Sequence, residues 1–414
     1  MSVVILLMLL AGAGLLLAVY LVRKRKGHAP KATSAGSALD VPKFRVVTLG
    51  LQGSGKTLLL TSMYRRLQVP GGRGFHVKAP YEQFIELSRW YRQIADDGEW
   101  PEGTTRGEMR EFEFSVMTEV GDDTKPVVKI GYLEYPGELL TDPDVAGSTA
   151  QARLLESIGK ADALIGIIDG LRVLQAYQGD RRGQAILQVT LDAMINAMLE
   201  SRKPIAFVIT KWDLLDQLHA DENTRLHIVR TLLMSIPGFR DLVRVQSARR
   251  VIRLIPVTAV GHDFAVLEGG HVRKKATGKL EPAHVDMALS AVVPDIVRQV
   301  ELSLDRETRE AIMTEARRRT KMGPAEALQT LGEFVAARAG KMLLSTAGGG
   351  LLADSGLALF LDSHFDDGGR KATALSEADR RADEQILARR RVVSELQQQV
   401  AVLEAKLPSS RLGD

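Results

Sequence analysis

Residues Gly50–Thr57 read Gly-Leu-Gln-Gly-Ser-Gly-Lys-Thr, and this spacing of glycine, lysine and hydroxyl suits the binding of a phosphate chain. Glycines can take positive φ angles, so that consecutive backbone N–H groups point at one anion. The lysine can reach the β- and γ-phosphates of a nucleotide and act in catalysis, and the threonine hydroxyl can ligate Mg²⁺. The predicted phosphate ligands are Gly50, Gly53, Ser54, Gly55, Lys56 and Thr57.

The residues around this loop predict the elements that must position it. Residues 44–49 are apolar and β-branched, as in a buried parallel strand. Residues 58–67 suit a helix with basic residues in its last turn, and the N-terminus of such a helix favours anions. Strand, loop and helix in this order argue against a chance glycine-rich turn.

A second candidate motif, Thr210-Lys211-Trp212-Asp213, directly follows an apolar run and resembles the [NT]-K-x-D guanine-specificity motif of Ras-like GTPases. An aspartate can accept hydrogen bonds from both the N1–H and the exocyclic amine of guanine, whereas adenine offers no such pair of donors. The stem of Lys211 can lie along the purine. A desolvated bidentate pair discriminates strongly between bases, so GTP and GDP are the predicted ligands. One strand later, the backbone N–H groups of Thr258 and Ala259 are predicted to contact the base.

Between these motifs, Leu-Glu-Tyr-Pro-Gly-Glu at 133–138 resembles the D-x-x-G switch motif of the same GTPases. The resemblance implies that Glu134 approaches Mg²⁺, that the N–H of Gly137 senses the γ-phosphate, and that Glu138 orients or deprotonates water. Glu134 replaces the aspartate of that motif and is one methylene longer, which leaves metal affinity and switch geometry open. The negative charge of Glu138 would repel the phosphate, so slow intrinsic hydrolysis is predicted.

The first switch needs a threonine that ligates Mg²⁺, and the polar segment 100–105 is its predicted place. Thr104 is favoured for this role over Thr105. Arg106 and Arg110 follow and are candidates for an internal arginine finger, although each also suits an ordinary solvated surface position.

The periodicity between residues 41 and 300 alternates apolar strands with helical stretches, which predicts an α/β fold with a doubly wound, mostly parallel sheet. Ligands of such sheets bind beyond the carboxyl ends of the strands, where all the motifs above fall. The predicted strands are 44–49, 112–118, 128–134, 163–169, 205–210 and 253–258. The predicted helices are 56–67, 80–96, 148–160, 171–201, 222–236 and 284–302.

Residues Val3–Val22 form an uncharged apolar run of 20 residues followed by Arg23-Lys24-Arg25-Lys26. This length and order predict a single transmembrane helix with its N-terminus outside and the remaining chain in the cytoplasm, at an inner or plasma membrane. An apolar leader or a buried hairpin is the alternative. Residues 27–40 suit a flexible linker.

The C-terminal part differs in composition. Residues 342–361 are apolar and Gly-rich but contain Asp354, so a packed or interfacial segment is favoured over a second membrane span. Residues 372–407 show a short heptad pattern interrupted by Arg389, which fits either a homodimeric coiled coil or an amphipathic helix lying on its own domain. The predicted organisation is an anchor with a basic stop (1–26), a linker (27–40), a P-loop GTPase domain (41–303), a helical and Gly-rich apolar region (304–370) and a C-terminal helix (371–414).

Composition excludes several kinds of chemistry. The chain has 414 residues and no cysteine, which rules out disulfides, thiolate metal sites and cysteine nucleophiles. A net charge of +4 is too small to argue for nucleic acid as a partner.

The set of motifs resembles the translation-factor-related class of P-loop GTPases, in particular bacterial Ras-like domains. The segments Trp-Pro-x-x-Thr at 100–104 and Tyr-Pro-Gly-Glu at 135–138 resemble bacterial double-GTPase-like proteins, although only one phosphate-loop motif occurs here. An apolar N-terminal span followed by a GTPase is similar in architecture to the signal recognition particle receptor β subunit. The resemblance implies a membrane-tethered switch that acts on a cytoplasmic partner. Two alternatives remain, a P-loop ATPase with Asp169 as its Walker-B acid and a degenerate nucleotide-binding scaffold.

Overall fold

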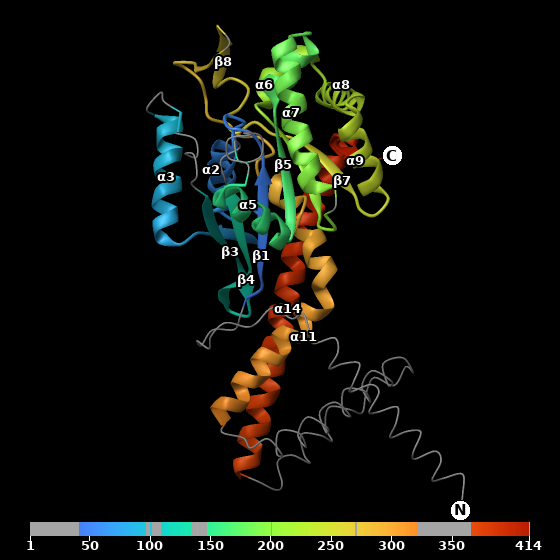
Figure 1. The fold of residues 1–414 in the computed structure, drawn as a ribbon. Coiled ribbons are helices and arrows are strands. Elements are labelled where there is room, and N and C mark those ends of the chain that lie inside the picture. Colours follow the sequence, from blue (N-terminus) through green and yellow to red (C-terminus); the bar gives the residue numbers. More distant parts are fainter. Residues whose placement is uncertain are drawn as a thin grey trace, which may run out of the picture. The chain divides into compact units, whose positions relative to one another are not determined.

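The computed structural model describes residues 41–96, 100–101, 109–134, 139, 147–199, 201–269, 271–320 and 366–413. All of these residues belong to one structural unit, Asp40–Asp414 (Figure 1).

An eight-stranded sheet forms the centre of this unit, in the order β10-β7-β6-β5-β1-β4-β3-β2. The five strands from β7 to β4 in that order run parallel, whereas β3, β2 and β10 pair antiparallel with their neighbours. A separate hairpin is formed by β8 and β9. The strands are β1 (Lys43–Leu49), β2 (Phe75–Lys78), β3 (Arg110–Val120), β4 (Asp123–Glu134), β5 (Ala163–Asp169), β6 (Ile205–Thr210), β7 (Ile252–Pro256), β8 (Ala265–Glu268), β9 (His271–Lys274) and β10 (Arg411–Leu412).

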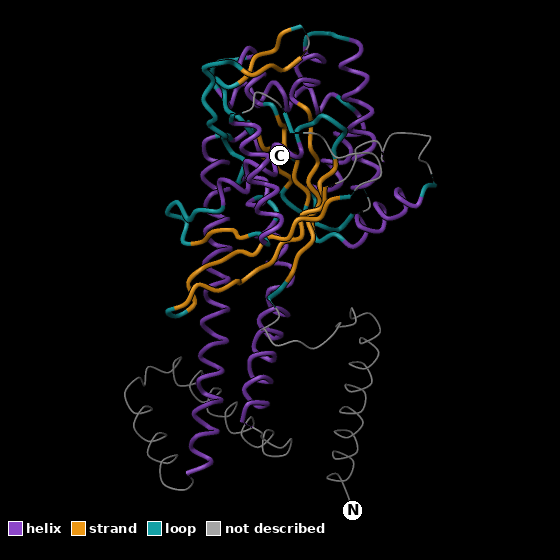
Figure 2. The backbone as a smooth tube through the Cα atoms, turned by 90° about the vertical axis from the view of Figure 1, so that its left-hand side faces the viewer, coloured by secondary structure: helices purple, strands orange, loops and turns teal. Residues whose placement is uncertain are grey.

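Helices cover both faces of the sheet (Figure 2). The helices are α2 (Lys56–Leu67), α3 (Tyr81–Ala95), α5 (Thr149–Lys160), α6 (Gly170–Tyr177), α7 (Arg181–Met198), α8 (Glu222–Ser235), α9 (Pro237–Ser247), α10 (Met287–Ser290), α11 (Val293–Thr320) and α14 (Asp366–Lys406). Two short 3₁₀ helices, η3 (Trp212–Leu218) and η4 (Pro408–Ser410), complete the set within the described ranges.

The central strands explain why the sheet forms where the sequence predicts it. All residues of β6, and all of β5 except Asp169, are buried. Continuous apolar runs of this kind are what a strand needs when helices cover both of its faces. All six predicted strands are confirmed, and the mostly parallel α/β fold is confirmed with them.

The predicted helix at 171–201 is two helices in the structure. Gly179 has a φ of +81°, and the carboxylate of Asp180 accepts hydrogen bonds from the N–H groups of Arg182 and Gly183. A left-handed glycine followed by a capping aspartate ends one helix and starts the next, so the chain turns between α6 and α7.

The C-terminal residues belong to the same sheet. Arg411 and Leu412 form β10, which pairs antiparallel with Arg253 and Ile252 of β7. Helix α14 packs along α11, as both views show (Figures 1 and 2). The unit around the sheet therefore extends well beyond the predicted domain boundary at residue 303.

The heptad positions of α14 face the protein's own chain. Ile386, Leu396, Val400 and Leu403 are buried, as is the guanidinium-bearing side chain of Arg389. Arg389 donates to Asp305 Oδ1 at 2.5 Å and to Thr308 Oγ1 at 3.1 Å, both on α11. The pattern thus reflects a helix that packs on its own domain, and the structure gives no support to a homodimer through residues 372–407.

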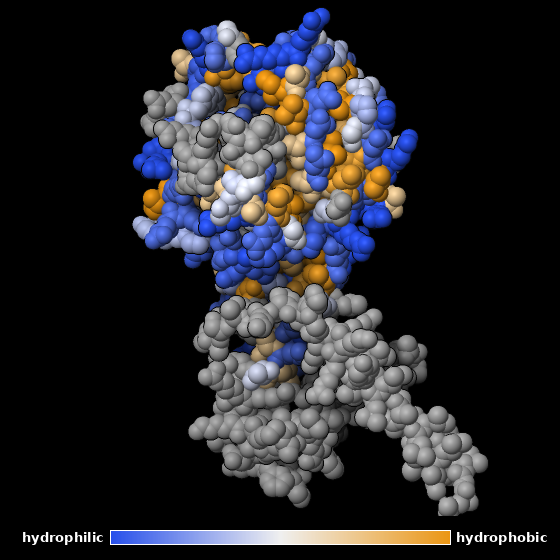
Figure 3. Space-filling view, viewed as in Figure 1, coloured by the Kyte–Doolittle hydropathy of each residue, from blue (hydrophilic) through white to orange (hydrophobic). Residues whose placement is uncertain are grey.

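The predicted single-pass membrane protein is contradicted. None of the helices in the described part of the chain is long and apolar enough to cross a membrane. The longest of them, α11 and α14, carry charged residues along their whole length, and Figure 3 shows hydrophilic and apolar residues mixed on one face of the protein. The predicted span at 3–22 and the apolar segment at 342–361 lie outside the described residues.

Candidate nucleotide-binding site

The phosphate loop connects β1 to α2 and has the backbone conformation that its glycines were expected to provide. Gly53 and Gly55 have φ angles of +75° and +86°. At Gly50 the constraint is space, because a Cβ atom there would lie 2.9 Å from Ile167 Cβ. A side chain at any of these three positions would distort the loop, either through backbone strain or through a clash.

Lys56 is the first residue of α2 and is 6% exposed. Its ammonium group donates to the carbonyl oxygens of Gly50 and Leu51, each at 2.9 Å, and so lies over the loop itself. The first turn of α2 contains no acidic residue, and its N-cap, Gly55, makes no side-chain hydrogen bond to the helix. A cation and a helix N-terminus therefore act on the same loop, and both favour an anion.

Thr57 connects the loop to the neighbouring strand. Its hydroxyl donates to Glu134 Oε1 at 2.6 Å, and Glu134 is fully buried at the carboxyl end of β4. Burial raises the pKa of Tyr132, and the nearby charge of Glu134 raises it further. A hydroxyl and a carboxylate held together are hard oxygen ligands of the kind that Mg²⁺ prefers, so this pair fits the ion.

Thr210 joins the phosphate loop to the base loop, which is the predicted base-binding segment 210–213 after β6. Its hydroxyl donates to Ser54 O at 2.6 Å. A Cβ atom added to Gly55 would lie 3.6 Å from the Cβ of Thr210, so the two loops are in close contact. The next residue, Lys211, has a φ of +51°, one of two positive φ values among the described non-glycine residues. Such conformations persist only where surrounding contacts hold them, and they gather at functional sites.

The carboxylate of Asp169 holds Lys211 in place. Lys211 Nζ lies 2.8 Å from Asp169 Oδ2, while Asp169 Oδ1 accepts the N–H of Leu171 at the start of α6. Asp169 therefore positions the base loop and caps a helix. The hydroxyl of Thr57 is bonded to Glu134 instead, which argues against Asp169 as the acid of an ATPase.

Asp213 lies beside the second predicted base contact. Burial raises the pKa of Asp213, whereas a hydrogen bond with the Thr258 side chain acts in the opposite direction. The Thr258 hydroxyl also accepts the N–H of Gly261 at 2.8 Å. The loops after β6 and β7 thus meet at the side chains that the sequence singled out.

The backbone at 258–261 pairs with a segment that the sequence did not link to the site. The N–H of Thr258 donates to Ala283 O at 3.3 Å, and the N–H groups of Ala283 and Glu281 donate to Thr258 O and Val260 O. Ser62 of α2 donates its hydroxyl to Ala259 O at 2.7 Å. Because the amide of Thr258 is directed at Ala283, Ala259 becomes the stronger candidate for an N–H donor to the base.

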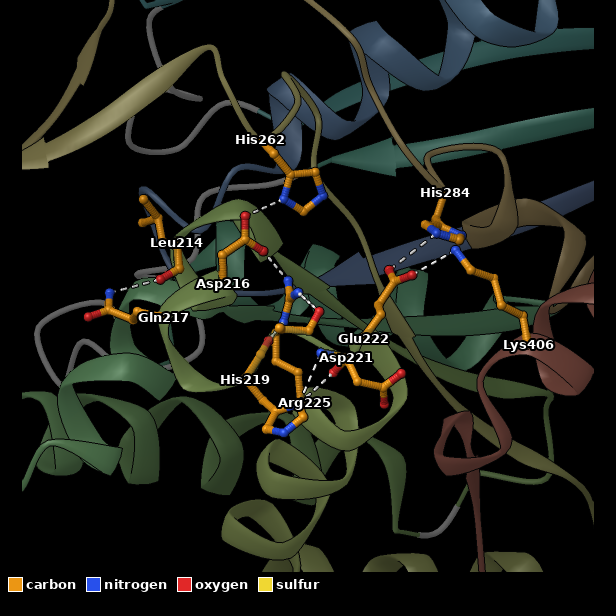
Figure 4. A network of polar contacts seen from close by, with 11 residues as sticks. Leu214, Asp216, Gln217, His219, Asp221, Glu222, Arg225, His262, His284 and Lys406 are labelled. Carbon is orange, nitrogen blue, oxygen red and sulfur yellow. Dashed lines mark hydrogen bonds and ion pairs between the residues drawn. The ribbon is translucent and has the colours of Figure 1, made fainter.

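A polar network around Asp216 connects the segment after the base loop to neighbouring elements (Figure 4). Asp216 of η3 binds His262 Nδ1 at 2.6 Å and also pairs with Arg225 of α8, whose guanidinium lies 5.4 Å from the ring centre of Trp212. These contacts tie η3 to α8 and to the loop after β7. Sequence reasoning missed this network, since its members are ordinary surface residue types.

The same figure shows a second cluster around Glu222. His284 Nε2 and Lys406 Nζ lie 3.5 Å and 2.7 Å from its carboxylate oxygens. The pKa of Glu222 is lowered to about 2. The hydrogen bond with His284 is the largest cause, and the hydrogen bond with Lys406 also lowers this pKa. His284 follows the segment that pairs with Thr258, so the end of α14 is linked to the base loop through Glu222.

The described residues bring together the predicted phosphate ligands, Glu134, and the base-loop residues Thr210, Lys211, Asp213, Thr258 and Ala259 on one edge of the sheet. Thr104, Gly137 and Glu138 lie outside the described residues, as do Thr105 and Arg106. Arg110 is the first residue of β3, and its guanidinium lies 5.3 Å from the ring centre of Trp90. This contact gives Arg110 a packing role.

A phosphate loop at the end of one parallel strand, an acid at the end of the next and a base loop on the same edge define a P-loop GTPase. Residues 45–251, half of the chain, match the double-GTPase 2 family model, and the chain belongs to this family of GTP-binding proteins. No curated protein matches the chain. Among solved structures, that of Sup35 complexed with GDP is similar at 13% identity over 55% of this chain, with a TM-score of 0.29, and the match spans 40% of that chain.

Proposed function

We propose that this protein binds GTP with Mg²⁺, hydrolyses it slowly and acts as a nucleotide-dependent switch for a protein partner. The observation that carries the proposal is the meeting of two loops at one sheet edge. The hydroxyl of Thr210 binds the phosphate loop at Ser54 O, and Asp213 follows three residues later. A nucleotide held by the phosphate loop would therefore have its base beside the carboxylate that selects guanine.

Thr57 and Glu134 would hold the metal in this proposal, because they supply a hydroxyl and a carboxylate 2.6 Å apart. Bound Mg²⁺ would neutralise charge on the β- and γ-phosphate oxygens. Thr104 is proposed as a further ligand from the first switch.

Slow turnover follows from the residues proposed near the γ-phosphate. Glu138 is proposed to orient water, yet its negative charge would repel the phosphate more than a neutral amide would. Gly137 is proposed to sense the γ-phosphate through its N–H. A switch requires that the GTP and GDP states differ in the affinity of the partner surface, and residues 100–110 and 134–145 are proposed to provide that difference.

Turnover of GTP by the purified full chain tests the enzymatic part. We expect slow, Mg²⁺-dependent release of phosphate, faster for Glu138→Gln than for the wild type because a repelling charge is removed. Lys56→Ala should abolish the signal. Equal rates with Lys56→Ala would identify a contaminating enzyme and contradict the proposal.

Amide hydrogen exchange in the GDP state and with a non-hydrolysable GTP analogue tests the switch. We expect the two states to differ within 100–110 and 134–145, with little change in β5 and β6. Identical exchange in both states would contradict a switch.

A second candidate function is a scaffold that binds nucleotide without turning it over. The observation in its favour is Glu134, a buried and longer acid at the position where the family motif has aspartate. Bound GTP that stays intact in the presence of Mg²⁺ would favour this scaffold over the enzyme.

A further inference from the structure

A surface cavity of about 370 Å³ is lined by three arginines and one amide side chain, Arg202, Arg249, Arg250 and Gln299. Arg202 precedes β6, Arg249 and Arg250 follow α9, and Gln299 lies on α11. Residues that are distant in sequence therefore meet here, and three of the four carry a positive charge.

The cavity lies at the opposite sheet edge from the nucleotide site. Arg202 and Arg250 come shortly before the amino ends of β6 and β7, whereas Lys211 and Thr258 follow the carboxyl ends of the same parallel strands. At about 3.3 Å per residue, a six-residue strand separates the two edges by roughly 20 Å. A ligand in this cavity would not be the nucleotide of the phosphate loop.

The three arginines have no acidic partner among the described residues. None of them forms an ion pair there. The charge of Asp295 acts on Arg250, but the Asp295 carboxylate is bonded to Arg253 at 3.2 Å. Elsewhere in the same unit arginines are commonly paired, as Arg389 is with Asp305 and Arg309 is with Asp379.

Arg250 lines the cavity beside a second positive charge. Its Nη2 donates to Ser201 O at 3.1 Å, whereas its Nη1 is buried and has no hydrogen-bond partner among the described residues. Burial, and after it the neighbouring charge of Arg249, lowers the pKa of Arg250. The two guanidinium groups repel each other, and an anion bound between them would remove that repulsion.

We propose that this cavity is a binding site for a ligand that carries a phosphate or diphosphate group. Guanidinium groups present planar pairs of N–H donors that match phosphate oxygens, and three of them suit a multiply charged group better than a single carboxylate. The amide of Gln299 adds a neutral donor and acceptor at the rim. The phosphate group can come from a small soluble compound or from a lipid headgroup, and the two sources are separated by the experiment below.

The test uses inorganic pyrophosphate and the full chain carrying Lys56→Ala, so that binding at the phosphate loop is strongly weakened. Isothermal titration should show one saturable site in this background. Arg202→Gln with Arg249→Gln should weaken it by about tenfold or more, since each charged hydrogen bond lost costs of that order. Both arginines are exposed and their side chains make no hydrogen bond to described residues, so the double variant should fold.

Arg244→Gln is the matched control, because Arg244 is an exposed arginine on α9 that does not line the cavity. Its affinity for pyrophosphate should equal that of the parent. Equal affinity in the Arg202/Arg249 double variant would overturn the proposal, as would absence of binding to the parent both for pyrophosphate and for vesicles. Binding to phosphatidylcholine vesicles only when they contain phosphatidic acid, with loss in the double variant, would identify the lipid source. Pyrophosphate binding without vesicle binding would identify the soluble source.

Discussion

The two halves of the nucleotide site are built differently. The phosphate half depends on backbone conformation, with left-handed glycines at 53 and 55 and a lysine that lies over its own loop. The base half depends on side chains and distant segments, since Thr258 is bonded to Ala283 and Asp216 is held by His262 and Arg225.

The difference shows how each half can fail. A change at Lys56 in the phosphate half should weaken ligand binding and leave the fold intact, because its hydrogen bonds to Gly50 O and Leu51 O stay within the loop. A change behind the base half should lower stability as well, because the same contacts tie η3, α8 and the end of α14 together. Substitutions in each half can test this contrast, beginning with the largest expected effect.

Asp213→Asn should abolish the preference for GTP over ATP. A neutral amide cannot accept both guanine hydrogen bonds, and sites of this kind reject the wrong partner by about 10⁴-fold. The measurement is the ratio of the GTP and ATP dissociation constants in Mg²⁺ buffer. Asp192→Asn, at an exposed position on α7, is the control and should leave the ratio unchanged. A preserved ratio in Asp213→Asn would show that another group selects the base.

Lys56→Ala should weaken binding of both GDP and GTP by about 100-fold, with the larger loss for GTP. Its stability should stay near that of the wild type, because the two hydrogen bonds given above join the lysine to carbonyl groups of its own loop. Equilibrium titration and thermal unfolding measure the two quantities. Lys279→Ala, an exposed lysine near the base half, serves as control. A cooperative loss of the fold in Lys56→Ala would remove the contrast between the halves.

Glu134→Gln should weaken the dependence of GTP affinity on Mg²⁺ by about tenfold, since the carboxylate beside Thr57 loses its charge. Glu134→Asp keeps the charge and should retain most of the dependence. The measurement is GTP affinity across a Mg²⁺ titration, with Glu119→Gln on β3 as the exposed control. An unchanged Mg²⁺ dependence in Glu134→Gln would show that the metal is held elsewhere.

Glu222 should make the base half sensitive to acid. Its pKa is lowered from 4.5 to about 2, chiefly by His284, so the stabilisation is fully present above about pH 4.5 and is lost as the pH falls toward 2. Glu222→Gln should therefore lose about 1 kcal/mol of unfolding free energy at pH 7, after allowance for partial exposure, and much less near pH 2. Urea unfolding at both pH values measures this, with Glu310→Gln of α11 as control. A loss of unfolding free energy that is the same at both pH values would show that the contact between Glu222 and His284 is not its cause.

The phosphate half could be predicted from the sequence because its information is local. Gly53, Gly55, Lys56 and Thr57 act through chain neighbours and one helix terminus, so spacing alone reveals them. The central strands β5 and β6 were equally predictable, because a strand covered on both faces is continuously apolar. The base loop was located by its place after β6.

The supporting contacts could not be predicted, because they join residues that are far apart in the chain. Nothing in the sequence around Lys406 indicates a bond to Glu222, and the two-residue strand β10 is too short to carry a pattern. The partner of the heptad pattern in α14 could not be predicted either. Periodicity identified its apolar seam correctly, but only the structure shows that the seam packs on the protein's own chain.

The central claim is that one sheet edge forms a guanine nucleotide site. Its most direct test is equilibrium competition of GTP and ATP for the purified full chain in Mg²⁺ buffer. We expect GTP to displace labelled GDP at concentrations several orders of magnitude below those at which ATP does so. Equal displacement by the two nucleotides, or tighter binding of ATP, would contradict the claim.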